Sequence, residues 1–519
     1  MQRHCRSRLP ARLAAVGALS AFLASATLHP VRAGQADNVL VVGSTVDPQT
    51  LDPAVGLLGT DIPYLYPLYD RLIDFEPATL EPRPGLATSW KWSDDRKVLE
   101  LRLREGVTFQ DGTPMDAEAV RTSLQYFKDA RRNLDLDTVT SIEVRGPYTL
   151  ALHLDRPNST LIGLLAERAG MVISPAAIAK WGVKEVGQHP VGAGPFMLKS
   201  LEPGKAVQLV RYPGYWKGDE PRLAGIEFRI IRNATSLVTA LQSGQLDYVA
   251  ALDPVNLPVL QRNARLRVAV EPSIAFGIIN MRTGQKPLDD KRVRRAVALS
   301  IDRQVLANAA FGGGVKGGPA VMPAPPQYWP ASKALENALT YQPDEAKRLL
   351  AEAGYPDGID FEVCVVGTLG SPLPTAKLAD IMREEMRPAG IRLKTTQVAS
   401  NPACNDLFQQ GKSSTFTATW SGRPDPALTY AQVLGSHTAF NIDGTKFDDA
   451  DDVIARLISA PDRDAQKKEF DRLNHIWVEN IPMIPLYYYV NVVAYNARLS
   501  GEQPNLLGRP YVSVLRFDK

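Results

Sequence analysis

A strand–helix–strand succession between residues 361 and 398 is the feature that most restricts the fold of this chain. Residues 361–366 (FEVCVV) and 391–398 are predicted strands, and residues 376–388 between them are predicted to be largely helical. Such a β-α-β unit is the building block of α/β proteins, in which helices cover a sheet. The chain has 519 residues, too many for one hydrophobic core, so we expect two or more domains.

The first 33 residues have the pattern of a secretory signal peptide. Arginines precede an uncharged apolar run at residues 13–28, and Val31-Arg32-Ala33 offers small residues at the positions that a signal peptidase reads. The apolar run is too short for a comfortable membrane span. Cys5 lies before the run and therefore cannot become a lipid-anchored first residue of the mature chain. We expect a soluble protein exported to the periplasm, with a single membrane anchor as the weaker alternative.

Removal of residues 1–33 changes the charge balance and the cysteine count. The segment holds five arginines and no acids, so the formal net charge falls from +3 to about −2. No basic surface typical of nucleic-acid binding is therefore expected. Two cysteines remain, Cys364 and Cys404. In an oxidising compartment the pair predicts one disulfide, and two separate buried thiols are the alternative.

The stretch 415–426 (TFTATWSGRPDP) is the candidate ligand-binding segment. It opens as a strand that ends at Trp420, and then a glycine and two prolines break the strand. We predict an aromatic platform followed by a rigid turn that carries Arg423 and Asp425. Such a combination offers apolar area for affinity and fixed charges for orientation. The alternative is a tryptophan of the core followed by a solvated turn.

Motifs of enzymes and of metal sites are missing from the sequence. It contains no Gly-x-Ser-x-Gly and no His-Glu-x-x-His, and the mature chain keeps only four histidines. The acidic run at 448–452 lacks the glycine and spacing of a calcium loop. We therefore expect a binding protein that is not an enzyme and uses no cofactor or metal. A secreted hydrolase is the rival hypothesis, and turnover of a substrate would distinguish the two.

Several segments together resemble the periplasmic oligopeptide- and dipeptide-binding proteins of ABC importers, which form the extracellular solute-binding protein family 5. The clearest is residues 103–120 (LREGVTFQDGTPMDAEAV), which is similar to the family signature except that Ala119 stands where an acid is usual. The other segments are 191–196 (VGAGPF), 215–216 (YW), 240–247 (ALQSGQLD), 290–296 (DKRVRRA), 301–303 (IDR) and 346–356 (AKRLLAEAGYP). The resemblance covers essentially the whole mature chain.

The resemblance implies an α/β fold of the two-lobed periplasmic-binding-protein type, of the large cluster C-like kind, with an extra domain in the first lobe. Two strands would cross between the lobes, near residues 275–281 and 486–493, and would permit hinge closure. The implied domains are a lobe-one core (37–75, 190–279 and 490–519), an extra domain of lobe one (76–189) and lobe two (280–489).

The resemblance also implies the function and the site. A monomer would capture a short peptide between the lobes and deliver it to a permease of the inner membrane; a non-peptide anion, opine-like or sugar-like, is the runner-up ligand.

In many relatives a tryptophan at the position of Trp420 lines the pocket, and an Asp three residues later pairs with the ligand's α-amino group. Here Arg423 takes that place, and an arginine suits a carboxylate or phosphate. Asp425 either restores an amine partner or pairs with Arg423. Ser421 and Gly59 complete the predicted ligand-binding set, although the loop that contains Gly59 is more simply a connection. Nickel or haem capture, known in the family, would recruit His437 or His475.

Overall fold

The computed structural model describes residues 37–518, with gaps at 57–58, 131–134, 312–332, 367–374, 400, 437 and 439. The predicted signal segment, the glycine- and proline-rich stretch at 312–330 and His437 therefore lie outside the described residues. None of the described helices is long and apolar enough to cross a membrane.

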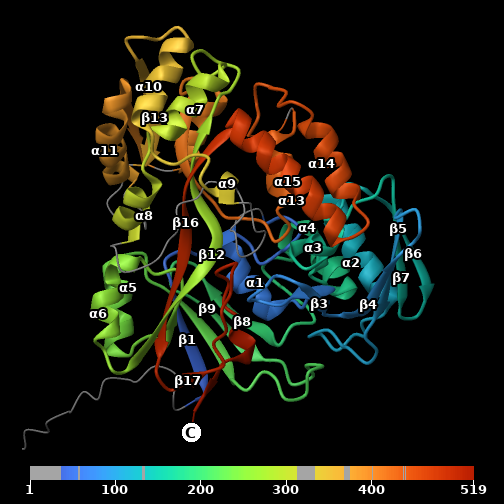
Figure 1. The fold of residues 1–519 in the computed structure, drawn as a ribbon. Coiled ribbons are helices and arrows are strands. Elements are labelled where there is room, and N and C mark those ends of the chain that lie inside the picture. The colour runs from blue at the N-terminus through green and yellow to red at the C-terminus, as the bar shows by residue number, and fades with distance from the viewer. Residues whose placement is uncertain are drawn as a thin grey trace, which may run out of the picture. The chain divides into compact units, whose positions relative to one another are not determined.

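A ten-stranded sheet runs through the protein, and two neighbouring inner strands of it are long. Strand β12 (Leu266–Met281) and strand β16 (Met483–Asn496) pair antiparallel along their length, with a break in register between Pro272 and Phe276 (Figure 1). The expected crossing segments, 275–281 and 486–493, lie within these two strands. The sheet order is β14 (Ile391–Val398), β13 (Ile359–Val366), β15 (Thr415–Trp420), β12, β16, β11 (Tyr248–Val249), β1 (Val39–Ser44), β10 (Gly225–Ile230), β9 (Ala206–Arg211) and β8 (Phe196–Glu202).

The β-α-β unit predicted from the sequence is confirmed. Strands β13 and β14 pair in parallel from Ile359 opposite Ile391, and helix α11 (Thr375–Met386) connects them. The candidate strand β15 lies between β13 and β12. Its last residue, Trp420, is paired with Phe276 of β12. The strand that leads to the candidate turn is therefore held next to a central strand of the sheet.

The long helix predicted from residue 291 to about 310 is wrong, because the chain forms two helices, α7 (Lys291–Leu299) and α8 (Arg303–Phe311). The carboxylate of Asp302 accepts the backbone N–H groups of Gln304 and Val305 at 3.0 and 3.1 Å, and so caps the start of the second helix. Helical periodicity continues across the break, which hides the cap from a pattern search.

A separate four-stranded antiparallel sheet carries its own core. Its order is β4 (Ala87–Trp92), β5 (Val98–Leu103), β7 (Thr149–Leu154) and β6 (Val139–Gly146). Helix α2 (Ala117–Ala130) contributes Val120, Leu124 and Phe127 to the hydrophobic cluster of this sheet. The chain thus forms a mixed α/β architecture with an additional antiparallel unit.

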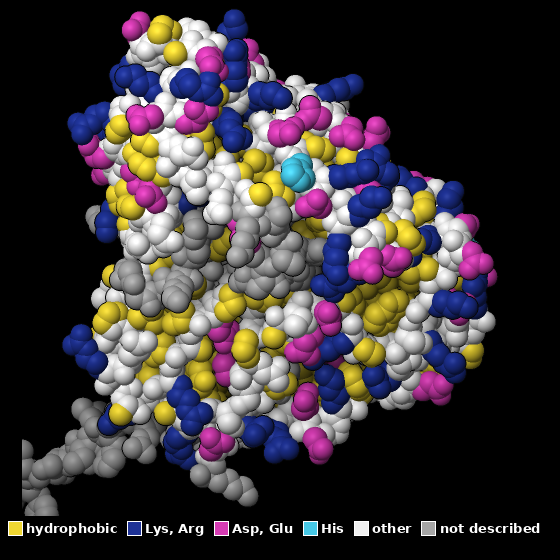
Figure 2. Space-filling view, in the orientation of Figure 1, with side chains coloured by type: hydrophobic (Ala, Val, Ile, Leu, Met, Phe, Trp, Pro, Cys, Tyr) yellow, Lys and Arg dark blue, Asp and Glu magenta, His cyan; other side chains and the backbone are white. Residues whose placement is uncertain are grey.

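Figure 2 shows Lys and Arg side chains interspersed with Asp and Glu over the face in view, in keeping with the small net charge of the mature chain.

The remaining helices and strands cover the sheets or connect them. These elements are α1 (Ile62–Leu68), β2 (Ile73–Phe75), β3 (Pro82–Pro84), α3 (Leu161–Leu165), α4 (Pro175–Glu185), α5 (Ala234–Ser243), α6 (Leu257–Gln261), α9 (Lys333–Glu336), α10 (Pro343–Glu352), α12 (Asn401–Gln409), α13 (Ala427–Leu434), α14 (Ala450–Ser459), α15 (Arg463–Asn480), β17 (Leu499–Ser500) and β18 (Arg516–Phe517).

Candidate ligand-binding site

Trp420 ends strand β15 as part of a packed aromatic group. Its ring centroid lies 6.4 Å from that of Phe276 and 4.7 Å from that of Phe440. The indole N–H donates to the hydroxyl of Thr429 at 3.1 Å, which satisfies its one polar group. The residue is 6 % exposed. Trp420 is therefore mainly a residue of the core, and only a small edge of it remains accessible.

The turn after Trp420 exposes Ser421 and Arg423. Gly422 has a φ of +72°, and a Cβ at that position would lie 2.7 Å from the carbonyl oxygen of Ile274. Glycine is thus required here both by conformation and by the close approach of the neighbouring chain. The turn is fixed by its backbone, which holds the Arg423 side chain away from the core.

Asp425 stabilises the start of helix α13 and does not pair with Arg423. Its carboxylate accepts the backbone N–H of Ala427 at 2.9 Å. Burial raises the pKa of Asp425 to about 6, and the hydrogen bond from Ala427 opposes that shift. No ion pair joins Arg423 to Asp425, or to any other residue that the structure describes. The predicted alternative in which Asp425 pairs with Arg423 is therefore not seen in the structure.

The turn faces a charged group from a distant part of the chain. Burial raises the pKa of Asp135, and the positive charge of Arg423 is the strongest influence that opposes this rise. The negative charge of Glu167 raises it further. A side chain at Gly163 would meet Asp425 Cβ at 3.7 Å, so helix α3 lies against the same turn. The charge of Arg423 therefore reaches the carboxyl group of Asp135, which is far away in the sequence.

Ion pairs continue from this group toward Gly59. Arg168 lies 3.9 Å from Asp61, a buried residue that also accepts the Gln49 backbone N–H at 2.8 Å. Glu167 pairs with Arg509 close to the C-terminus. Gly59 is exposed, and a Cβ there would meet no atom within 4 Å. Sequence patterns missed Asp135, Glu167 and Arg168, because no motif links them to the turn.

Cys364 and Cys404 form a disulfide that supports the strand of the site. Their sulfur atoms are 2.08 Å apart, and both residues are fully buried. The bond connects helix α12 to strand β13, at the residue that pairs with Phe416 of β15. Phe408 and Phe416 pack around it, with ring centroids 4.9 Å apart.

The described residues offer no metal-binding cluster. No group of three His, Cys, Asp or Glu side chains lies close enough to hold an ion within the described ranges. His475 is exposed on α15 and lies 3.9 Å from Asp471. The other histidine considered for a metal, His437, is outside the described part of the chain.

Comparison with known proteins places this architecture in a family. Residues 81–441 match the bacterial extracellular solute-binding proteins, family 5. The glutathione-binding protein GsiB of Escherichia coli (strain K12) is 28% identical over 515 residues, with 94% of this chain and 95% of that protein covered. A dipeptide-binding protein from Pseudoalteromonas sp. SM9913, solved in complex with Met-Leu, superposes with a TM-score of 0.79 and 22% identity, covering 92% of this chain and 100% of the other. The protein AgaA from A. tumefacien R10, solved in complex with agropinic acid, gives a TM-score of 0.79 with 22% identity, covering 93% of this chain and 99% of the other.

Proposed function

We propose that this chain, which belongs to the bacterial extracellular solute-binding proteins of family 5, captures a short peptide between its two lobes and delivers it to the permease of an ABC importer. The family consists of substrate-binding proteins and not of enzymes, and its members act in the periplasm. The proposal includes export by a signal peptide that ends near Ala33, and action as a monomer.

The observation that carries the proposal is the arrangement of charges around Arg423. This exposed arginine has no ion-pair partner among the described residues, and its positive charge acts on the carboxyl group of Asp135. A peptide carries a carboxylate at one end and an ammonium group at the other. The carboxylate would bind Arg423, and the ammonium group would bind Asp135. Both charges of the ligand would then be paired, which is needed when charged groups leave water.

The polarity of the bound peptide would be the reverse of that in many relatives. Where those proteins place an Asp for the α-amino group, this chain offers Arg423 on the same turn. The charge of Arg423 acts on Asp135, so the amino end of the ligand would bind at Asp135. Trp420 would supply the edge of its ring, and Ser421, Asp425 and Gly59 would border the ligand.

The proposed domain division supports a hinge mechanism. Residues 280–489 would form lobe two, and the break in register between Pro272 and Phe276 lies just before that segment begins. A ligand that contacts both lobes binds the closed arrangement more tightly than the open one, and so shifts the population toward closure. The relevant permease would recognise the closed, loaded form.

The test begins with mass spectrometry of the solute that co-purifies with the mature protein. Glutathione, the ligand in the name of the GsiB relative, is the first peptide to titrate by isothermal calorimetry. Loss of a charged hydrogen bond costs ~1.5–3 kcal/mol, so Arg423→Ala should weaken peptide binding by about 10- to 150-fold. Arg102→Ala, an exposed arginine on β5, is the matched control and should leave the affinity unchanged.

Blocked peptides decide the orientation. Amidation of the peptide carboxylate should weaken binding to the wild type and have little further effect on Arg423→Ala. An equal effect of amidation on both proteins would contradict the role of Arg423. Co-purification of one defined non-peptide anion would replace the peptide by an opine-like ligand, a possibility that the Arg423 side chain also favours.

A further inference from the structure

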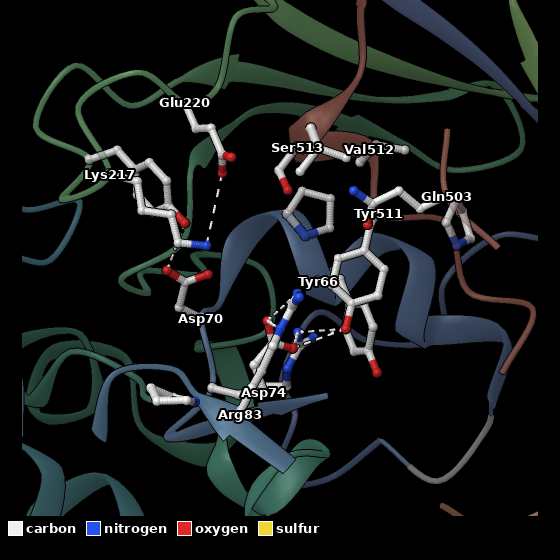
Figure 3. A pocket seen from close by; sticks show the side chains of 16 residues that line it. Tyr66, Asp70, Asp74, Arg83, Lys217, Glu220, Gln503, Tyr511, Val512 and Ser513 are labelled. Atoms are coloured by element: carbon white, nitrogen blue, oxygen red, sulfur yellow. Dashed lines mark hydrogen bonds and ion pairs between the residues drawn. The ribbon is translucent and has the colours of Figure 1, made fainter. Parts of the chain in front are cut away.

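A cavity of about 240 Å³ lies away from the turn at 421–426. It is lined by the end of helix α1, strands β2 and β3, the loop 215–220 and the C-terminal segment 503–514 (Figure 3). None of its lining residues belongs to the segment 280–489. The cavity therefore lies entirely within the proposed lobe one. None of its lining residues belongs to the turn at 421–426, and Tyr66, on its wall, contacts Glu167 at 3.5 Å.

The two ends of the cavity carry opposite net charges. One end has the carboxylates of Asp70 and Glu220 with the single ammonium group of Lys217, whose nitrogen is 3.9 Å from Glu220. The other end has the guanidinium groups of Arg71 and Arg83 with the single carboxylate of Asp74, which accepts hydrogen bonds from both arginines. Figure 3 shows Lys217 and Glu220 across the open space from Arg83 and Asp74.

Each end also has a buried polar atom without a hydrogen-bond partner. Nε of Arg71 and Oε2 of Glu220 make no hydrogen bond with any described residue. Arg71 is 8% exposed, and its guanidinium carbon lies 4.0 Å from the ring centre of Tyr66 and 5.5 Å from that of Tyr511. Buried donors and acceptors are normally satisfied, so one unmet donor and one unmet acceptor at a cavity indicate a place for a polar solute.

We propose that this cavity binds a free amino acid. The carboxylate of the amino acid would accept from Arg71 and Arg83, and its ammonium group would donate to Glu220 and Asp70. A simple anion or cation would satisfy only one end. The volume lies just below the ~300–1,000 Å³ of pockets for drug-sized ligands, which fits an amino acid with a short side chain. The hydroxyl of Ser513 and the amide of Gln503 also border the space.

Neighbouring contacts show that the walls of the cavity are organised before any solute enters. Asp70 accepts from the hydroxyl of Tyr215 at 2.9 Å and from the indole N–H of Trp216 at 2.6 Å. The hydroxyl of Tyr511 donates to Asp74 at 2.9 Å. A site whose charged groups are already held in place loses little side-chain entropy when it binds a small ligand.

Isothermal calorimetry with L-alanine tests the proposal on the purified mature protein. Propionate and ethylamine, which each carry one of the two charges, are the comparison solutes and should bind at least tenfold more weakly. Glu220→Gln and Arg83→Gln alter opposite ends of the cavity, and each should weaken L-alanine binding at least tenfold. Glu202→Gln, an exposed glutamate paired with Lys205, is the matched control and should bind like the wild type.

The outcomes separate this site from the peptide site. Binding of L-alanine that is lost in Arg423→Ala but kept in Glu220→Gln would overturn the inference, because the amino acid would then occupy the space between the lobes. Absence of L-alanine binding at millimolar concentration, or equal affinity for propionate, would overturn it as well. Failure of glutathione to bind, with L-alanine binding intact and dependent on Glu220, would reject the proposed peptide and leave the cavity assignment standing.

Discussion

Replacement of Arg96 by alanine should weaken peptide binding although Arg96 touches no part of the proposed peptide site. Arg96 lies in the tight turn between β4 and β5, in the segment predicted as the extra domain of lobe one. Its guanidinium donates to the carbonyl of Pro461, just after helix α14 and within the proposed lobe two, at 2.6 Å. Two further contacts join the same segments: the Ser159 N–H donates to the Ile458 carbonyl at 2.8 Å, and Arg463 pairs with Glu81 at 3.3 Å. Figure 1 shows α14 and α15 beside this part of the chain.

The size of the effect follows from the lost hydrogen bond. A hydrogen bond from a charged donor contributes ~1.5–3 kcal/mol, and the lower end applies here because the Arg96 contact is partly exposed to solvent. If the bond exists only in the closed arrangement, its loss shifts the balance toward the open one. For a protein that is mainly open without ligand, ~1.5 kcal/mol raises the apparent Kd about 12-fold.

The assay is calorimetric titration of the ligand that co-purifies, with wild type, Arg96→Ala and the control Arg102→Ala. The thermal unfolding midpoint of each variant is measured as well, since a loss of folding would mimic a loss of affinity. A Kd for Arg96→Ala within twofold of the wild type, with normal folding, would refute the role of this contact in closure. The same result would count against placing 93–96 and 457–463 in different lobes.

Two further predictions concern stability. Joint replacement of Cys364 and Cys404 by alanine should lower the free energy of unfolding by up to ~4 kcal/mol, because the bridge closes a loop with a sequence separation of 40. Urea unfolding with and without reductant measures this loss. An unchanged unfolding midpoint would contradict the prediction. Burial raises the pKa of Asp247 to about 6 from an ordinary value of 3.8. The protonated carboxyl of Asp247 therefore adds up to ~3 kcal/mol to the free energy of unfolding, and this contribution is fully present below pH ~4. It is lost as pH rises through about 6. The amide of Asp247→Asn does not titrate, so this variant should gain up to ~3 kcal/mol relative to the wild type between pH 4 and pH 8. Its stability at pH 4 sets the baseline, because the carboxylate that it replaces accepts from the Val41 N–H and the Asn496 amide. A difference that does not change with pH would exclude this cause.

Much of the fold was predictable because periodicity reports burial. At residues 361–398 the apolar residues follow a strand pattern, then a helix pattern, then a strand pattern again. This succession predicts a β-α-β unit, and the structure confirms it. The break between α7 and α8 was missed because Asp302 caps the start of α8 without interrupting the helical pattern of apolar residues. Local hydrogen bonding decided that boundary.

The candidate site was predictable only on one of its sides. The turn at 421–426 is marked by its own glycine and prolines, so Arg423 was recognised as a fixed, exposed cation. Asp135, on which the charge of Arg423 acts, belongs to a remote segment with no pattern of its own. A linear sequence contains no signal for the packing that brings this segment near the turn.

The segments that reveal the family serve the scaffold, which explains why they say little about the ligand. Gln110, in the clearest of these segments, donates to the carbonyls of Leu68, Gly194 and Phe196 at 2.9, 3.2 and 2.7 Å. Arg303, in another, is buried and donates to the carbonyls of Pro485 and Leu339 among others. Buried groups of this kind hold distant strands and helices together, and their removal leaves backbone carbonyls without partners.

A ligand-selecting residue has the opposite requirements. Its side chain must stay exposed until the ligand arrives, and its polar atoms must not already be hydrogen-bonded or ion-paired within the protein. Arg423 meets both conditions among the described residues, whereas Gln110 and Arg303 meet neither. Family membership therefore follows from residues whose bonds are already made, and ligand identity depends on residues whose bonds remain to be made. If Arg423 selects the ligand as proposed, its presence where the resemblance implies an acid changes the second set without disturbing the first. A protein of this fold could then change its solute while every scaffold segment still resembles its relatives.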